Sequence, residues 1–281
     1  MKIRESSLPA GWYPRNLDEI SRFLSEWGRS SARAALAPHA GWRYSGKIAA
    51  RAVSSLDRNV ETLAVIGGHL PAGCPPLFAL EDSVSTPLGG MSINAGLRAA
   101  LRAEIGGRED RYPDNTVEVL LPMARFFFPE ASLLWLRLPA ELSSFDAGKA
   151  IASAAAKLGC GVAVLASSDL THYGPNYGFT PKGTGAEALH WVREVNDRCF
   201  INAVESGDPA AVLERAETDS SSCSAGAVLG AMGFAAAEKL GSARLLGYGT
   251  SADTETAEGP EVPDSFVGYA AMAYDGYNHS Q

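Results

Sequence analysis

Four side chains in this sequence can bind metals or move protons, and they stand where an α/β fold would gather them: His39, His69, His172 and Cys223. Imidazole nitrogens and a thiolate sulfur are ligands for zinc, copper and iron, and imidazole is also a common general acid and base. Three of the five histidines come directly after predicted strands. Two histidines and a thiolate suffice for a metal site that keeps open positions for water or substrate.

His39 lies in the segment LAPHAGWRYSG at 36–46. Pro38 favours an extended residue before it and Gly41 lets the chain turn, so the imidazole is predicted to point into a cleft. A histidine bonded to local backbone is the alternative. Tyr44 and Ser45 could bind ligand oxygens, or Tyr44 could pack and Ser45 could cap the next helix. We favour the cap for Ser45.

His172 lies in the most specific segment, LASSDLTHYG at 165–174, where a buried strand runs directly into polar residues. Asp169 stands three positions earlier and could orient the imidazole or accept its ring proton. That pairing would suit acid–base chemistry or metal binding. The alternative is a turn capped by the aspartate, with the histidine at the surface.

His69 and Cys223 lie in segments whose local chemistry suits a ligand. Gly67 and Gly68 precede His69 and allow close backbone approach at the end of a strand. Cys223 is predicted to begin a helix, where the helix dipole and free N–H groups favour a thiolate. That thiolate could be a ligand or a nucleophile, and a buried cysteine at a helix start is the alternative.

Short apolar runs alternate with helical stretches, which predicts an α/β domain with a mostly parallel central sheet and helices on both faces. Strands are predicted at 33–38, 61–67, 131–139, 161–169, 243–251 and 265–274, with a hairpin excursion at 77–93. Helices are predicted at 45–56, 94–105, 116–127, 145–158, 184–206, 209–216 and 223–240. The polar segment 253–264 is predicted to be a mobile loop or part of a lid. No repeat or linker divides the sequence, so one domain is expected over residues 1–281.

Composition argues against several classes of protein. Hydrophobic residues make up 46% and charged residues 20% of the 281 residues, as in ordinary globular domains. The net charge is -8 and the sequence contains no run of lysine and arginine, so neither nucleic acid nor a membrane is an expected partner. The first residues lack the apolar core of a secretion signal, and the four cysteines form no CxxC pair. A cytoplasmic location is therefore expected.

The motifs occur in a recognisable order: PHAGWRYSG at 38–46, GGH at 67–69, STPLGG at 85–90, VEVLLP at 117–122, SSDLTHYG at 167–174, then Cys223. Together they resemble the Memo family, one component of the bacterial AmmeMemoRadiSam set. That family is similar to the type III extradiol ring-cleaving dioxygenases. The resemblance covers nearly the whole chain and implies the fold of the dioxygenase catalytic subunit.

The resemblance also implies roles for individual residues. The thiolate would replace the carboxylate ligand of the dioxygenases, so iron(II) is favoured as the one divalent transition metal, with copper or zinc as alternatives. Asn115 stands where the family usually has a histidine that could line the pocket. The implied metal ligands are His39, His69 and Cys223, the acid–base pair is His172 with Asp169, and the predicted substrate contacts are Tyr44 and Tyr173.

Three functions follow from these residues. The leading hypothesis is a metal-dependent, dioxygenase-like oxidoreductase that acts on a small molecule, with a radical-SAM protein among its candidate partners. The second is a non-enzymatic module that binds a peptide or ligand in the same pocket, since animal members of the family are associated with phosphopeptide recognition. The third is a thiol hydrolase that uses Cys223, His172 and Asp169 as nucleophile, base and orienter.

Overall fold

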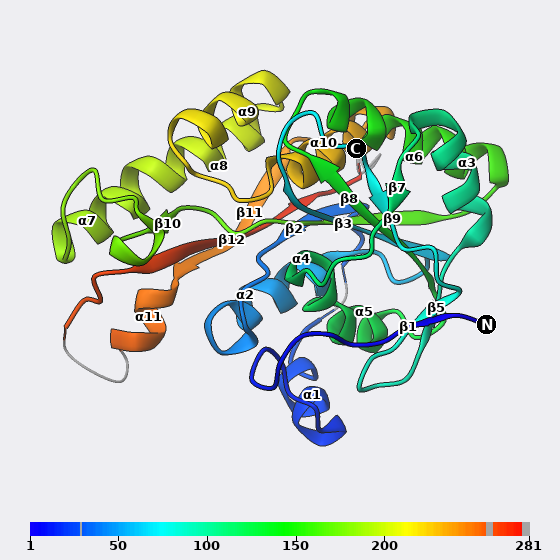
Figure 1. The fold of residues 1–281 in the computed structure, drawn as a ribbon, viewed down its shortest axis with the longest axis horizontal. Helices are drawn as coiled ribbons and strands as arrows, with labels where there is room; N and C mark the ends of the chain where they lie inside the picture. The colour runs from blue at the N-terminus through cyan, green and yellow to red at the C-terminus, as the bar shows by residue number, and fades with distance from the viewer. Residues whose placement is uncertain (29, 257–260, 277–281) are drawn as a thin grey trace, which may run out of the picture.

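A mixed β-sheet forms the centre of the fold. The computed structural model describes residues 1–28, 30–256 and 261–276. Within them, a nine-stranded sheet has the order β10-β12-β2-β9-β3-β8-β4-β7, and β11 pairs with β12 (Figure 1). The four central strands run parallel, and they are β2 (Ala34–Ala37), β9 (Val162–Ser167), β3 (Thr62–Leu70) and β8 (Ser132–Pro139). Their carboxyl ends therefore meet at one edge of the sheet.

Antiparallel pairs flank these four strands. On one side lie β12 (Phe266–Tyr274), β11 (Ala243–Thr250) and β10 (His172–Tyr173), and on the other lie β4 (Leu77–Phe78) and β7 (Arg108–Glu109). The predicted excursion at 77–93 divides between β4 and a hairpin of β5 (Ser83–Val84) and β6 (Met91–Ser92), which β1 (Ile3–Arg4) joins. The α/β prediction is confirmed, but the parallel arrangement holds mainly for the centre, because hydrophobic runs do not encode strand direction.

Helices cover both faces of the sheet, as predicted. One face carries α3 (Ala95–Ile105), α6 (Ser143–Leu158), α8 (Asp197–Ser206), α9 (Pro209–Thr218) and α10 (Ala225–Ala237). The other carries α1 (Leu17–Leu24), α2 (Trp42–Ser55), α4 (Asn115–Glu118) and α5 (Leu121–Phe127). The remaining helical elements are η1 (Pro175–Tyr177), α7 (Ala186–Trp191), η2 (Val192–Asn196) and α11 (Ser251–Thr256). No helix of the described ranges is long and apolar enough to cross a membrane.

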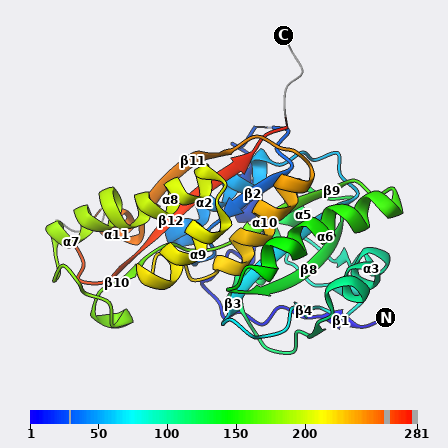
Figure 2. The same ribbon diagram turned by 90° about the horizontal axis from the view of Figure 1, so that it is seen from above.

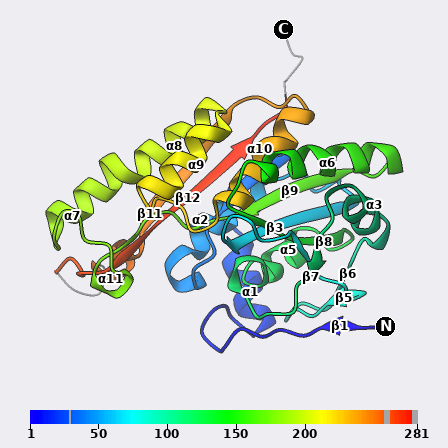
Figure 3. The same cartoon turned by 45° about the horizontal axis from the view of Figure 1, so that its top comes forward.

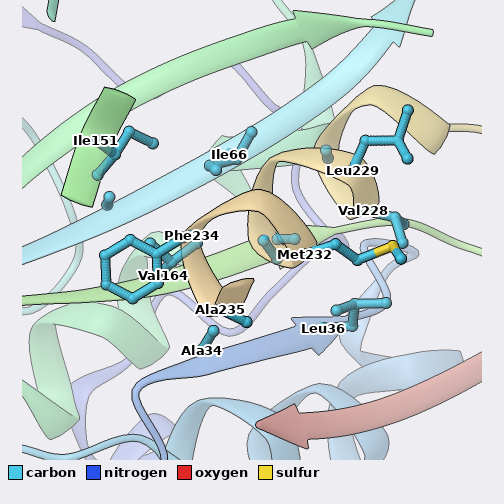
Figure 4. Close-up of a cluster of buried hydrophobic side chains, with 14 of the residues drawn as sticks. Ala34, Leu36, Ile66, Ile151, Val164, Val228, Leu229, Met232, Phe234 and Ala235 are labelled. Atoms are coloured by element: carbon cyan, nitrogen blue, oxygen red, sulfur yellow. The ribbon is translucent and has the colours of Figure 1, made fainter. Parts of the chain in front are cut away.

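Alternation along the central strands explains the two layers. In β2, Ala34 and Leu36 belong to the core under α6 and α10, whereas Ala35 and Ala37 belong to the core under α1, α2 and α5. Figure 4 shows Leu36 and Ala34 of β2 facing the apolar residues of α10. A strand that is buried on both faces appears in the sequence as a continuous apolar run, and this is why the central strands could be predicted from the sequence.

Some predicted boundaries are wrong. The helix after His39 begins at Trp42 with Gly41 as its N-cap, so Ser45 is not the cap. Ser45 is buried inside α2, where its hydroxyl donates to the carbonyl of Ala40 at 3.0 Å. The helix predicted at 116–127 divides into α4 and α5, and that predicted at 184–206 divides into α7, η2 and α8. Part of the predicted loop at 253–264 is helical in α11, while 257–260 lie outside the described residues.

Glycines let α6 and α10 approach closely. A Cβ on Gly148 would lie 1.9 Å from the carbonyl oxygen of Gly230, and one on Gly233 would lie 1.8 Å from that of Phe145. Figure 2 shows the two helices side by side above the sheet. Since α10 leads directly from the candidate metal ligand Cys223, this close packing fixes where that ligand segment begins.

We expect Gly148→Ala to destabilise the protein, because the added methyl group cannot fit against Gly230. Overpacking of this kind costs about 1–3 kcal/mol of unfolding free energy. Gly96→Ala in α3 is the matched control, since its nearest contact would be Asn94 Oδ1 at 3.6 Å. At that position, replacing a helical glycine with alanine should raise the free energy of unfolding by about 0.5–1 kcal/mol. Urea unfolding measures both, and equal shifts for the two variants would contradict the packing argument.

Candidate metal centre and adjoining cavity

Three predicted ligands converge at the carboxyl edge of the central strands. His39 follows the end of β2 by two residues, His69 lies near the end of β3, and Cys223 precedes α10. Their ligand atoms all lie within 4.8 Å of one another. Strands far apart in sequence thus bring together two imidazoles and a thiol, as expected where parallel strands end.

Contacts to both ring nitrogens and to the backbone N–H hold His39 in place. Its side chain is 1% exposed, Nδ1 lies 2.8 Å from the Ser167 hydroxyl, and Nε2 lies 3.2 Å from the Cys223 sulfur. Its backbone N–H donates to Asp169 Oδ1 at 2.7 Å. A ring proton donated from Nδ1 to Ser167 leaves the Nε2 lone pair for a metal, the usual arrangement around a ligating histidine.

His69 is turned toward the cluster by an irregularity in β3. The pairing of β3 with β8 shifts register between Gly67 and Leu70, and His69 has a φ of 57°. Such bulges re-aim side chains next to functional sites. The ring is one-third exposed, and its Nδ1 lies 3.1 Å from Asp114 Oδ2, so Nε2 is the nitrogen left for a metal.

The two glycines before His69 admit protein segments. A Cβ on Gly67 would lie 2.2 Å from Thr116 Oγ1, and a Cβ on Gly68 would lie 2.4 Å from the Cβ of Ser224. The prediction that these glycines allow close approach therefore has a specific physical cause. Glycine at 68 lets the segment that carries Cys223 lie directly against β3.

Cys223 lies just outside its helix. The helix begins at Ala225 with Ser224 in the N-cap position, so the prediction that Cys223 begins it is wrong by two residues. The backbone N–H of Cys223 donates to the Asp169 carbonyl at 3.3 Å. Ser222 and Ser168 share a hydrogen bond of 2.8 Å beside it. The loop that follows β9 therefore holds the thiol in place.

Mutual electrostatics set the protonation states of the cluster. Burial alone would raise the pKa of the Cys223 thiol, but the charge and hydrogen bond of His39, with those of His69, hold it well below its usual value. Burial alone would lower the pKa of His69, but hydrogen bonds to Asp114 and Cys223 raise it to about 10. Hydrogen bonds from His69 and Thr116 overcome burial and lower the pKa of Asp114 to about 2. The cluster therefore favours the charged forms of both the Cys223 thiol and the His69 imidazole.

The donor set fits a transition metal ion. Bonds of about 2.0–2.1 Å to imidazole nitrogen and about 2.3 Å to thiolate sulfur place tetrahedral donors about 3.5 Å apart. The 3.2 Å between Cys223 Sγ and His39 Nε2 is close to that value, and the third donor is within 4.8 Å. Binding would displace the proton from His69, as metals do from their ligands. Three protein donors leave a coordination position open.

A cavity of about 310 Å³ adjoins the cluster. It reaches the cluster through Asp169, whose carboxylate lies 3.9 Å from His39 Nε2. The predicted residues His172, Asp169 and Tyr44 all line it, and Tyr44 is 39% exposed at its mouth. The other lining residues are Trp12, Ala40, Gly41, Asn115, Asn176, Tyr177, Ser251, Ser265, Val267 and Tyr269.

Asp169 and His172 both line this cavity, but no hydrogen bond joins their side chains in the described chain. His172 Nδ1 lies 3.2 Å from the Leu170 carbonyl, whereas the Asp169 carboxylate accepts the backbone N–H of His39. Cys223 likewise contacts His39. Within the described chain, the predicted triad of Cys223, His172 and Asp169 is therefore not assembled.

Tyr173 lies outside the cavity lining. Its ring is fully buried and stacks on Phe266 with 5.1 Å between ring centroids, and its hydroxyl donates to the Gly183 carbonyl at 3.0 Å. Neighbours along a strand point to opposite faces, so Tyr173 faces away when its neighbour His172 faces the cavity. We therefore leave Tyr173 out of the candidate substrate contacts.

Two polar residues that sequence analysis missed support the site from a π-helical turn. Figure 3 shows α7 continuing into α8, and the π-helical turn η2 that joins them ends at Asn196, next to the first residue of α8, Asp197. Asn196 Nδ2 donates to Thr171 Oγ1 and to the Asp219 carbonyl, both at 2.9 Å. It thereby ties the His172 segment to the Cys223 segment. Its signal in the sequence was two adjacent polar residues inside an otherwise amphipathic helix.

The environment of Asp197 makes a pH dependence testable. Burial raises its pKa to about 6, opposed by hydrogen bonds from Thr171 and Tyr248. The pKa of Asp197 in the folded protein exceeds the ordinary value of 3.8, so folding favours the protonated carboxyl group. The stability that this protonated group contributes is therefore fully present below about pH 4 and is lost as pH rises through 6. At about 1.36 kcal/mol per pKa unit, the loss is about 3 kcal/mol.

We expect the unfolding free energy of metal-free wild type to fall by that amount relative to Asp197→Asn between pH 4 and 7. Urea unfolding at each pH gives the two curves. Asp18→Asn, at an exposed carboxylate on α1, is the matched control and should follow the wild type. Parallel curves for wild type and Asp197→Asn would show that this carboxylate does not titrate in that range.

Comparison with known proteins identifies the family of this chain. The model of the family described as Memo-like protein matches residues 4–273. A MEMO1 family protein of Pyrococcus abyssi is 29% identical, over 96% of this chain and 98% of the relative. One of Thermococcus onnurineus is 27% identical, over 97% and 99%. The solved structure of the uncharacterized protein JW3007 from Escherichia coli K12 covers 86% of this chain and 99% of its own, with 12% identity and a TM-score of 0.46. The family match spans nearly the whole chain, which therefore belongs to the Memo-like family.

Proposed function

We propose that this chain binds one divalent transition metal through His39, His69 and Cys223 and is a dioxygenase-like oxidoreductase for a small molecule. The observation that carries the proposal is the convergence of these three donors within 4.8 Å beside a 310 Å³ cavity. Iron(II) is the favoured metal, with copper or zinc as alternatives, because imidazole and thiolate suit all three. When bound, iron(II) would supply redox chemistry and open coordination positions.

His172 is the residue we assign to proton transfer. Its Nδ1 is held by the Leu170 carbonyl, and a proton on that nitrogen leaves Nε2 as a base. The imidazole lines the cavity, packed edge-on against Tyr177 with ring centroids 5.0 Å apart. A substrate hydroxyl in the cavity would therefore meet an imidazole of fixed orientation, as general base catalysis requires.

Other cavity residues would bind and orient the substrate. Burial and the charge of Asp169 raise the pKa of Tyr269, so its phenol stays protonated. Tyr44 offers a second hydroxyl at the mouth, and Trp12 contributes an aromatic wall. Asp169 lies between this cavity and His39, and burial raises its pKa, partly offset by the charge of His39. A small polar aromatic molecule would satisfy these groups.

One observation favours the second candidate function, a non-enzymatic module that binds a peptide or ligand in the same cavity. Asn115 stands in the lining, and its amide donates to the His39 carbonyl at 3.0 Å. Among the described lining residues, His172 is the one imidazole. A site with a single proton-transfer group suits binding as well as turnover.

The radical-SAM partner and the cytoplasmic location stay predictions.

Metal content tests the proposed centre. We expect about one iron, copper or zinc ion per chain in protein purified anaerobically without an affinity tag, and almost none in His39→Ala/Cys223→Ala, which keeps one ligand of three. His190→Ala/Cys199→Ala is the matched control, because it removes one histidine and one cysteine outside the cluster. Plasma mass spectrometry provides the measurement. Equal metal in all three proteins would place the metal elsewhere.

Replacement of His172 separates proton transfer from metal binding. His172→Gln should retain the metal content of the wild type, because His172 is not among the three converging donors. For any substrate found by screening with and without oxygen, we expect turnover to fall about 10²–10⁴-fold. Loss of metal in this variant would refute the assignment. Binding of a cavity ligand without turnover by metal-loaded wild type would favour the binding module.

A further inference from the structure

A second cavity, of about 900 Å³, is lined in part by Asp114, the residue whose carboxylate contacts His69 Nδ1. It is formed by α3, β4, β7 and β8 and by the segment that leads to α4. Figure 3 shows α3, β7 and β8 near one another at one end of the sheet. The cavity is lined by four arginines, so we call it the arginine cavity: Arg102, Arg108, Arg111 and Arg137. None of these residues lines the cavity that contains His172.

The arginine cavity is not evident from the sequence. The chain carries a net charge of -8 and shows no run of lysine and arginine. Folding nevertheless brings together arginines from positions 102 to 137, with two acidic lining residues, Glu109 and Asp114. A concentration of positive charge within an acidic protein indicates an anionic ligand more strongly than the same charge on a basic one would.

The arginines differ in how far their charge is already neutralised. Arg137 is buried and paired with Asp110 at 3.2 Å and with Asp114 at 3.1 Å, so it is part of the wall. Arg111 pairs with Glu109, but that pair is largely exposed and therefore weak.

The other two arginines have donors to spare. Arg108 is exposed and makes no hydrogen bond or ion pair from its guanidinium to any described residue. Arg102 donates to the Gly107 carbonyl at 3.4 Å, and its buried Nε has no partner among the described atoms.

The remaining lining determines which kind of anion would fit. Leu70, Leu77, Leu80 and two prolines provide apolar surface, and the mostly exposed ring of Tyr112 stands at the rim. A neighbouring cavity of about 730 Å³ shares Arg108 but is lined by three acidic residues, which would repel an anion. The charged group of a ligand would therefore lie on the side of Arg102 and Arg108, with an apolar body across the leucines.

We propose that the arginine cavity binds an organic anion, with a carboxylate or phosphate group at Arg102, Arg108 and Arg111 and an apolar body against Leu70, Leu77 and Leu80. Guanidinium groups bind both headgroups through paired N–H donors. A volume of about 900 Å³ accommodates a ligand of ordinary metabolite size. This site goes beyond the proposed metal chemistry and does not depend on it.

Calorimetric titration of the metal-free full chain tests the proposal, since removing metal with a chelator excludes coordination of the anion at the His–Cys cluster. The probes are phenyl phosphate and phenylacetate, compared with inorganic phosphate and with neutral benzyl alcohol. We expect at least one organic anion to bind with a Kd below about 1 mM. Inorganic phosphate should bind roughly tenfold more weakly without an apolar body, and benzyl alcohol more weakly still.

Substitutions locate the binding. Arg108→Met should weaken the organic anion about tenfold, because it removes a charge-assisted donor but keeps an apolar stem, and Arg108→Lys should restore part of the loss. Arg198→Met on α8 is the matched control, an exposed arginine outside the cavity, and should bind as wild type does.

Every outcome bears on the proposal. Binding of one probe alone supports it and identifies phosphate or carboxylate as the headgroup, and binding of both supports the shared chemistry. No binding up to about 10 mM would overturn it. So would affinity unchanged in both Arg108→Met and Arg102→Met, or benzyl alcohol that binds as tightly as the anions.

Discussion

The loop that follows β9 is the constraint on which the site depends. β9 lies between β2 and β3, so residues 167–169 emerge between the two strands that carry the histidines. Ser167 holds the ring of His39, and the Asp169 carboxylate holds its backbone N–H. The carbonyl of Asp169 accepts the N–H of Cys223. The last residue of β9 and the two residues that follow it thus hold two of the three converging donors, and the parallel order of strands makes this possible.

Sequence patterns predicted those parts of the molecule whose cause is local. The central strands are apolar on both faces, so they were recognisable as continuous runs, and the polar residues after them marked the edge where ligands gather. His39, His69, His172 and Cys223 were therefore candidates from the amino-acid sequence, and the family resemblance selected His39, His69 and Cys223 as the metal ligands. Ser45 shows the limit of local rules: a serine after a turn suits an N-cap, yet the helix begins three residues earlier.

What the sequence did not reveal depends on contacts between distant segments. Asp114 supports His69 across 45 positions, and Asn196, the last residue of a π-helical turn, reaches Thr171 across 25. The arginine cavity has the same origin, since its arginines come from separate elements. Asp169 and His172 are the converse case. They are three positions apart and line the same cavity, yet the Asp169 carboxylate accepts the backbone N–H of His39 and the His172 ring contacts the Leu170 carbonyl.

Charges of alternating sign extend from the cluster to the N-terminal strand. In the metal-free protein, imidazolium at His69 faces Asp114 at 3.1 Å, Asp114 faces Arg137 at 3.1 Å, and Arg137 faces Asp110 at 3.2 Å. Arg4 of β1 completes the row, 3.9 Å from Asp110 and stacked over the ring of Trp135.

Such a row has an energetic logic of its own. Buried charges are stable only when paired, and removing one partner costs about 3–5 kcal/mol because its neighbour is left unpaired. Each inner member of this row has partners on both sides, so the row can lie largely within the protein. It follows that Arg4, far from the cluster in sequence, belongs to the electrostatic support of His69. The short strand β1 therefore contributes to the site as well as to the small sheet in which it pairs.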